Sequence, residues 1–177
     1  MLFQDYAFET TMLSLLVTLT ALSGALGANP EPARGVIGQK KLATAVDCSG
    51  PVGFTGVGSS KVHPSGLISY KSTLVDHGVG FSRETGEFTV HCPGIYHIAF
   101  AAYGNSDNTR VVLRKRTNSD DWKDVLAAGG PHSSGGSNQI LLELNVGDQT
   151  GLWLKEGTLA PEPIPSTTFT AFRIAKK

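Results

Sequence analysis

The chain has 177 residues, in which 15 Lys and Arg balance 15 Asp and Glu, so its formal net charge is zero. Because neither sign of charge predominates, the composition favours neither a nucleic acid nor an anionic membrane as a partner. The 21 glycines and the lack of a long helix-period pattern predict an all-β chain, long enough for one domain with a real core once a leader is subtracted.

The N-terminal segment predicts a secretory signal peptide over residues 1–28, and therefore a secreted, extracellular protein. Residues 12–28, MLSLLVTLTALSGALGA, are apolar or small and uncharged, with Ala25 and Gly27 at the spacing of a signal-peptidase site. Residues 1–11 carry two acids and no base, an objection that translation starting at Met12 removes. The alternative is a membrane anchor, but 17 residues diluted by Ser and Thr argue against stable membrane insertion.

Residues 29–48 predict a flexible linker, because they are polar, rich in Pro, Gly and Lys, and without a sustained period. They contain no Gly-X-Y repeat and no heptad series, so neither a collagen stem nor a coiled coil is predicted there. Any assembly must therefore lie in the domain that we expect over residues 49–177.

Short apolar runs alternate with turn residues from Pro51 onward. Nine strands are expected, at residues 52–57, 66–74, 80–81, 87–90, 95–103, 110–115, 139–144, 150–155 and 168–174. Segments such as HPSG, RETG, GGPHSSGGS and NVGD have the residues of turns and loops. The pattern predicts an antiparallel double-sheet sandwich, most simply a jelly roll.

Three ordered blocks resemble the globular head domain of complement component one, subcomponent q. The first is FSRETGEFTVHCPGIYHIAF, with Phe81, Thr85-Gly86, Phe88, Pro93-Gly94 and Tyr96 in the family's pattern. The others are NQILLELNVGDQTGLWL and the closing STTFTAFRI. The resemblance covers about residues 50–175 and implies a ten-stranded jelly roll of the tumour necrosis factor type, assembled as a homotrimer.

Six large apolar residues exceed what one face of a small sandwich needs, so we expect them in the core or in a trimer contact: Tyr96, Phe100, Leu142, Trp153, Phe169 and Phe172. Sequence does not divide them between the two environments. A subunit contact built from several of them would be large and hydrophobic, as in obligate oligomers.

Nothing in the sequence predicts an enzyme or a bound cofactor. The five histidines have no metal-binding spacing, and HSSGGS lacks the strand-to-helix setting of a nucleophile. Calcium, which some members of the family bind, has candidate ligands in Asp107, Asp120, Asp121 and Asp148, but spacing supplies neither their number nor their geometry.

A local basic run, VVLRKRTNSDDWK, stands out in the neutral chain. Arg110, Arg114 and Arg116 are candidates for a patch that binds an anionic ligand such as an acidic glycan, since Arg makes bidentate contacts. The simpler interpretation, which the sequence favours, is an edge strand protected by charge against pairing.

The two cysteines are an even number in a chain expected to be secreted. An internal bridge from Cys48 to Cys92 is favoured and would contribute about 3 to 4 kcal/mol by loop entropy. Two alternatives stay open, a bridge between subunits through Cys48 and a buried free thiol at Cys92.

These features together predict a secreted, trimeric, non-enzymatic recognition module. Its expected ligands are extracellular glycans or microbial surfaces, bound in a lectin-like or pattern-recognition manner in innate defence. The alternative function is that of an extracellular matrix or signalling protein that binds a protein partner.

Overall fold

The computed structural model describes residues 47–77, 80–161 and 163–177, so the expected leader and most of the expected linker lie outside the described residues. A helical turn, η1 (Asp47–Ser49), precedes ten strands. Their bounds are β1 (Gly53–Val62), β2 (Ile68–Asp76), β3 (Phe81–Ser82), β4 (Glu87–Thr89), β5 (Gly94–Tyr103), β6 (Arg110–Arg116), β7 (Lys123–Gly129), β8 (Gly135–Leu144), β9 (Gln149–Glu156) and β10 (Thr168–Lys176).

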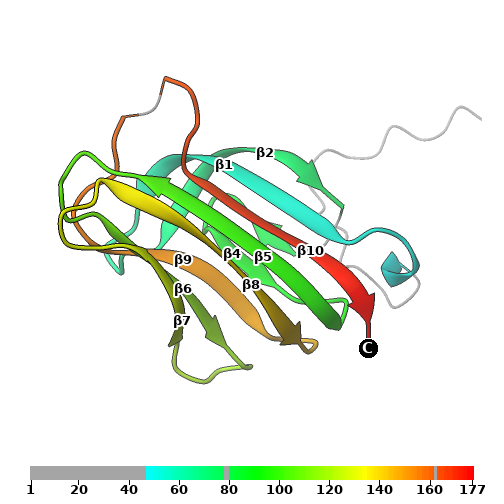
Figure 1. The fold of residues 1–177 in the computed structure, drawn as a ribbon. Coiled ribbons are helices and arrows are strands. Elements are labelled where there is room, and N and C mark those ends of the chain that lie inside the picture. The colour runs from blue at the N-terminus through cyan, green and yellow to red at the C-terminus, as the bar shows by residue number, and fades with distance from the viewer. Residues whose placement is uncertain (1–46, 78–79, 162) are drawn as a thin grey trace, which may run out of the picture. The chain divides into compact units, whose positions relative to one another are not determined.

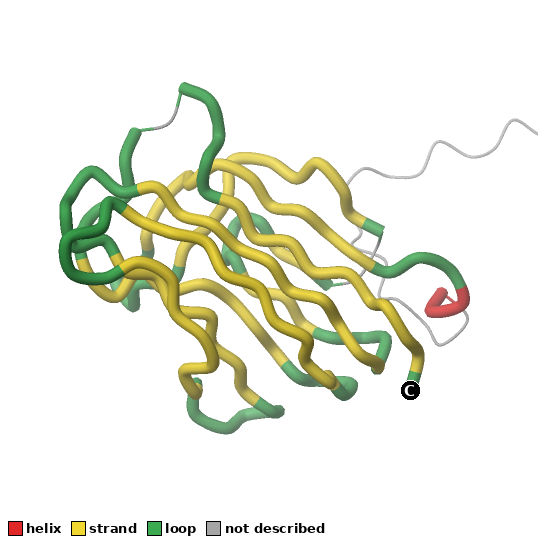
Figure 2. The backbone as a smooth tube through the Cα atoms, in the orientation of Figure 1, coloured by secondary structure: helices red, strands yellow, loops and turns green. Residues whose placement is uncertain are grey.

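The strands form two five-stranded sheets that pack face to face (Figures 1 and 2). Sheet A has the order β2-β1-β10-β5-β8, and sheet B has the order β3-β4-β9-β6-β7. All strand pairs are antiparallel. The prediction of an all-β, ten-stranded antiparallel jelly roll is therefore confirmed.

The structure contains one strand that the sequence pattern did not predict. β7 is the edge strand of sheet B, and its sequence KDVLAAG ends in residues that have low strand propensity. The next strand, β8, begins at Gly135 inside the expected loop GGPHSSGGS and pairs with β5 as far as Tyr103. Pairing with a well-formed central strand here overrides the glycine-rich local composition.

Aromatic side chains from both sheets fill the space between the layers. Phe54 of β1 stacks on Phe81 of β3 with ring centroids 4.0 Å apart, and it meets the edge of Phe169 at 5.1 Å. Phe88 of β4 lies 5.6 Å from Tyr96 of β5. All five side chains are at most 3% exposed, so these contacts form the hydrophobic core that joins the sheets.

The Thr85-Gly86 pair occupies the turn between β3 and β4, and the fold requires glycine there. Gly86 has a φ of +78°, and a Cβ atom would come within 1.8 Å of the Ile68 carbonyl oxygen. The Gly86 amide donates to the Ser82 carbonyl at 2.7 Å, and the Tyr70 amide donates to the Arg83 carbonyl at 2.8 Å. The turn is thereby fixed against β2, at one edge of the sandwich.

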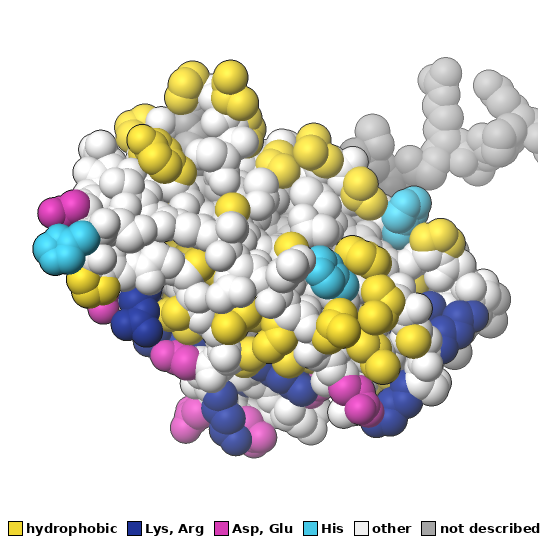
Figure 3. Space-filling view, in the orientation of Figure 1, with side chains coloured by type: hydrophobic (Ala, Val, Ile, Leu, Met, Phe, Trp, Pro, Cys, Tyr) yellow, Lys and Arg dark blue, Asp and Glu magenta, His cyan; other side chains and the backbone are white. Residues whose placement is uncertain are grey.

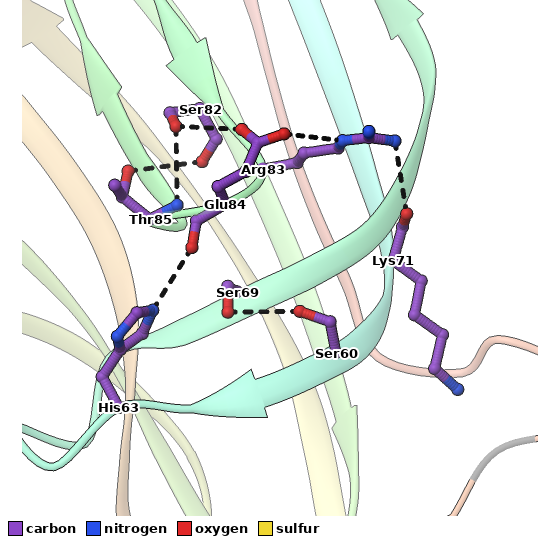
Figure 4. A network of polar contacts seen from close by, with 8 residues as sticks. All are labelled: Ser60, His63, Ser69, Lys71, Ser82, Arg83, Glu84 and Thr85. Atoms are coloured by element: carbon purple, nitrogen blue, oxygen red, sulfur yellow. Dashed lines mark hydrogen bonds and ion pairs between the residues drawn. The ribbon is translucent and has the colours of Figure 1, made fainter.

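Polar side chains hold the same turn from the solvent side (Figure 4). Arg83 Nε donates to Glu84 Oε1 at 3.0 Å, and Ser82 Oγ donates to Glu84 Oε2 at 3.3 Å. Arg83 Nη1 also reaches the Lys71 carbonyl at 3.4 Å, and His63 Nε2 lies 3.3 Å from the Glu84 carbonyl. These groups serve the geometry of the turn, which accounts for their position without a ligand.

Candidate interaction surfaces

The outer face of sheet A, the side turned away from the core, carries an apolar row that runs from the edge strand β8 across β5 to β10. Cross-strand pairing places Leu141 of β8 beside His97 of β5, and His97 beside Phe172 of β10. The His97 and Phe172 rings lie 5.1 Å apart, and His97 Nε2 is 3.0 Å from Gln139 Oε1. Leu141 is 57% exposed and Phe172 46% exposed, so solvent reaches most of this row.

Further apolar side chains extend the outer face of sheet A. Ile95 lies two residues before His97 on β5. Val75 of β2 pairs with Thr55 of β1, at the other side of the sheet. Both are exposed. Figure 3 shows this face, with hydrophobic side chains gathered around a histidine over the middle of the sheet.

Small side chains make a shallow groove next to the apolar row. Ala99 and Ala101 of β5, Ser137 of β8, and Thr168 and Thr170 of β10 border a space of about 500 Å³. Asn138 and Gln139 of β8 also border it, and none of the bordering side chains is charged. The surface therefore combines exposed apolar groups with room for another surface to approach the backbone.

The structure separates the six residues that we expected in the core or in a trimer contact. Tyr96, Phe100 and Phe169 are at most 1% exposed in the core, and Leu142 packs partly buried against it. Phe172 lies on the outer face of sheet A.

Trp153 lies neither in the core between the sheets nor on the outer face of sheet A. It is 3% exposed on the outer side of sheet B, covered by the half-buried Trp122 at a centroid distance of 4.5 Å. The alternating pattern of β5 predicts that Tyr96 and His97 lie on opposite faces. The alternating pattern of β9 places Trp153 on the outer side of sheet B, but it does not predict that a loop residue covers that ring.

The basic run on β6 has a different setting from the one that the sequence favoured. β6 lies between β9 and β7 and is not an edge strand, so the interpretation as a charge-protected edge is wrong. Arg110 Nη1 is 3.8 Å from Glu156 Oε1, and Arg114 Nε is 2.5 Å from Asp124 Oδ1. The hydrogen bond from Arg114 holds the pKa of Asp124 below its usual value.

Two further partners of this run are aromatic. We call Trp122, Trp153, Arg114 and Arg116 the Trp–Arg cluster. The Arg114 guanidinium lies 5.3 Å from the Trp153 ring centroid, and that of Arg116 lies 4.4 Å from Trp122. Arg116 Nε also donates to Gln149 Oε1 at 2.5 Å. The cations expected to form an anionic-ligand patch are thus engaged by side chains of sheet B and by Trp122 of the connection between β6 and β7.

The four aspartates considered as calcium ligands lie in three different connections. Asp107 follows β5, Asp120 and Asp121 lie between β6 and β7, and Asp148 lies between β8 and β9. Within residues 47–77, 80–161 and 163–177, no three His, Cys, Asp or Glu side chains are grouped so that they could hold a metal ion. Calcium binding stays untested.

Asp148 instead has a structural role. Its side chain is 1% exposed and lies 2.9 Å from Lys115 Nζ, while the Asn145 amide donates to Oδ2 at 2.9 Å. Burial opposes ionisation of this carboxyl, but hydrogen bonds from Lys115, the Asn145 amide and Thr117 outweigh it and lower its pKa.

The internal disulfide is confirmed, and it stands beside a pocket that the sequence did not reveal. Cys48 and Cys92 are bonded with their Cα atoms 5.5 Å apart, which ties η1 to the loop before β5. Next to the bridge, Arg173, Lys176 and Lys177 from the end of β10 line a space of about 450 Å³. The signal in the sequence was the ending RIAKK, with three cations among five residues and no acid.

The class of fold is that of the complement and tumour necrosis factor jelly rolls. The structure matches the globular domain of zebrafish complement 1qA protein with a TM-score of 0.57 and 20% identity, covering 72% of this chain and 100% of that one. It matches murine APRIL with a TM-score of 0.55 and 12% identity over 71% of this chain and 100% of that one. A tumour necrosis factor of S. frugiperda, Eiger, gives 0.55 and 14% over 72% and 94%.

The family itself follows from the sequence. The family model for the C1q domain matches residues 54–174, well over half of the chain. The protein therefore belongs to the C1q domain family, and the resemblance seen in the three sequence blocks is confirmed. In the part of the chain that the structure describes, no helix is long and apolar enough to cross a membrane.

Proposed function

We propose that the protein is a secreted homotrimeric recognition module that assembles through the outer face of sheet A. The observation that carries this proposal is the apolar row of Leu141 and Phe172, which are 57% and 46% exposed on strands β8 and β10 of sheet A. Soluble monomers rarely expose contiguous apolar patches of this kind, whereas obligate oligomers bury them. The fold family in which trimers are expected supplies the number of copies.

The groove of small side chains supports the same face as the contact. Ala99, Ala101 and Ser137 would let the backbone of a second copy approach closely, and Phe172 or Leu141 would then pack across the boundary. Stable interfaces bury about 800 Å² on each partner, an area that a five-stranded sheet face can supply. A trimer would present three copies of each ligand site and gain affinity through multivalency.

The proposed activity is binding and not catalysis, with glycans or microbial surfaces as ligands in innate defence. Three weak sites on one rigid particle suit repeated surface ligands, because avidity rises when several sites engage together. Recognition of a protein partner in the matrix or in signalling is the alternative. A glycan array and a pull-down with the same tagged protein would separate the two functions.

Assembly is tested first, by light scattering on the full secreted chain. We expect a mass of three chains for the wild type and a monomer for Phe172→Asp, since three buried charges at one contact would oppose association. Ile164→Asp is the matched control, because Ile164 is 80% exposed in the connection between β9 and β10, outside sheet A. A wild-type monomer at micromolar concentration would overturn the proposal.

A further inference from the structure

A pocket beside the disulfide differs in charge from the rest of the neutral chain. It lies where η1, the loop before β5 and the end of β10 meet, and Figure 3 shows Lys and Arg side chains at this end of the molecule. We call it the end pocket and define it by six lining residues: Ser49, His91, Pro93, Arg173, Lys176 and Lys177. No Asp or Glu side chain lines it.

Arg173 is held in place without a carboxylate. Its Nη2 donates to the Cys48 carbonyl and, at 3.4 Å, to that of Gly50, while Nη1 is 3.5 Å from the Pro93 carbonyl. No carboxylate side chain of the described residues lies within ion-pair distance of it. Backbone carbonyls orient the guanidinium but leave its positive charge uncancelled.

The surroundings of Arg173 and Lys176 leave the pocket positively charged. Burial raises the pKa of Tyr96 to about 12, and the positive charge of Arg173 acts in the opposite direction on that hydroxyl. Lys176 pairs across the sheet with Gly94, which has no side chain that could neutralise it. Lys177, in contrast, contacts Glu143 and Asn145 outside the pocket. Arg173 and Lys176 are therefore the pocket cations whose charge no carboxylate of the described residues cancels.

The disulfide fixes the side of the pocket opposite β10. Cys48 supplies the carbonyl that Arg173 contacts, and its bond to Cys92 ties that carbonyl to the loop that contains His91 and Pro93. Tyr96 Oη, which is buried, donates to the Cys92 carbonyl at 2.5 Å. The cation is thus oriented by covalently linked backbone before any ligand arrives, which lowers the entropic cost of binding.

The size and lining of the end pocket indicate the ligand. About 450 Å³ is within the range of small-molecule sites and exceeds what a lone ion needs. Arg173 and Lys176 suit an oxyanion, the Ser49 hydroxyl suits a sugar hydroxyl, and Pro93 offers an apolar wall. We infer that the end pocket binds a sulfated or carboxylated sugar unit of an acidic glycan, an inference that rests on the proposed recognition function.

The test is calorimetry on the full secreted chain with a sulfated, carboxylated disaccharide derived from heparin. We expect Lys176→Gln to weaken binding by about tenfold or more, through the loss of charge-assisted contacts. Arg173→Lys should also weaken binding, because it keeps the charge but loses the carbonyl contacts that orient the guanidinium. Lys61→Gln, an exposed lysine of β1 outside the pocket, should leave affinity unchanged.

Three comparison ligands complete the experiment. Sodium sulfate and the desulfated, carboxyl-reduced disaccharide should each bind much more weakly than the intact disaccharide. Equal binding of sodium sulfate would overturn the glycan assignment, and so would tighter binding of an acidic peptide of equal charge. Unchanged affinity in Lys176→Gln would overturn the site while a trimeric mass still supported the proposed function. A monomeric wild type that binds the disaccharide would support the site and overturn the proposed trimeric function.

Discussion

The molecule carries two groups of basic side chains that differ in what surrounds them. In the Trp–Arg cluster, Arg114 lies 2.5 Å from Asp124, and Arg116 lies on the face of Trp122. In the end pocket, Arg173 contacts only backbone carbonyls among the partners that the described residues provide. The run on β6 is the more conspicuous one in the sequence, yet the end pocket has the uncancelled charge. Capacity for an anion depends on this difference and not on the number of cations.

Strand position explains why the two groups differ. β6 has a neighbour on each side, so cross-strand pairing places Asp124 opposite Arg114 and Glu156 opposite Arg110. Lys176 stands near the end of β10, where its partner on β5 is Gly94. A central strand receives compensating side chains from both neighbours, whereas a strand end meets loops and backbone.

Removal of the disulfide should have the largest effect and should act on one region alone. We expect Cys48→Ser with Cys92→Ser to lower the free energy of unfolding by about 3 to 4 kcal/mol, because the unfolded chain gains loop freedom. The end pocket should lose its affinity for the heparin disaccharide as well, since the Cys48 carbonyl no longer holds Arg173. Urea denaturation and calorimetry measure the two effects.

The control for this prediction is built into the sequence. The chain has two tryptophans, Trp122 and Trp153, and both lie in the Trp–Arg cluster. Their native emission should therefore stay unchanged in the serine variant below its unfolding transition. An unaltered urea midpoint would contradict the stabilising effect of the disulfide, and a shifted native emission would contradict the separation of the two regions.

Sequence predicted the parts of the fold that depend on local pattern. Alternation along β5 placed Tyr96 and Phe100 on an apolar face. The Thr85-Gly86 turn was part of the three blocks that indicated the family, and the structure shows why glycine is required there. The sequence did not predict β7, because a strand rich in Ala and Gly has little local strand propensity. Its strand conformation depends on pairing with β6.

The sequence did not predict the end pocket, for a different reason. Arg173 and Cys48 are 125 residues apart, and only the closure of β10 against β1 and β5 brings them together. The same limit applied to the six large apolar residues, because the sequence shows that Phe172 and Phe169 are both large but not which of them faces the opposite sheet. Contacts of high sequence separation carried the information that local patterns lack.

Truncation of Trp153 tests the other side of the comparison, with a smaller effect. We expect Trp153→Ala to lower the free energy of unfolding by about 3 kcal/mol, since a buried ring is lost and Trp122 loses its support. Affinity of the end pocket for the disaccharide should not change. Trp122→Ala should cost less because that ring is only half-buried.

Urea denaturation with calorimetry on both tryptophan variants provides the measurement. Equal losses in the two variants would show that Trp153 is not the buried member of the pair. A loss of disaccharide affinity in Trp153→Ala would show that the two basic regions are coupled and not independent.

Acid should lower the stability of the fold through Asp148, the partner of Lys115 on β6, with the smallest of these effects. The folded pKa of Asp148 is lowered, so its ionised form stabilises the fold above the unfolded value of about 3.9, and this contribution is lost as pH falls through the folded pKa. Asp148→Asn should lower the free energy of unfolding by about 1.5 to 3 kcal/mol at pH 6, through loss of its charge-assisted hydrogen bonds. At pH 3 the difference from wild type should shrink.

Urea midpoints at pH 6 and pH 3 measure this change, with the exposed Asp121→Asn as the control. The control should follow the wild type at both pH values. If Asp148→Asn lost the same stability at both, its role would be packing and not charge. A shrinking difference would locate charge compensation at Lys115, the member of the β6 run that points inward to a buried acid. The end pocket has no such acid, so acid should not remove its positive charge.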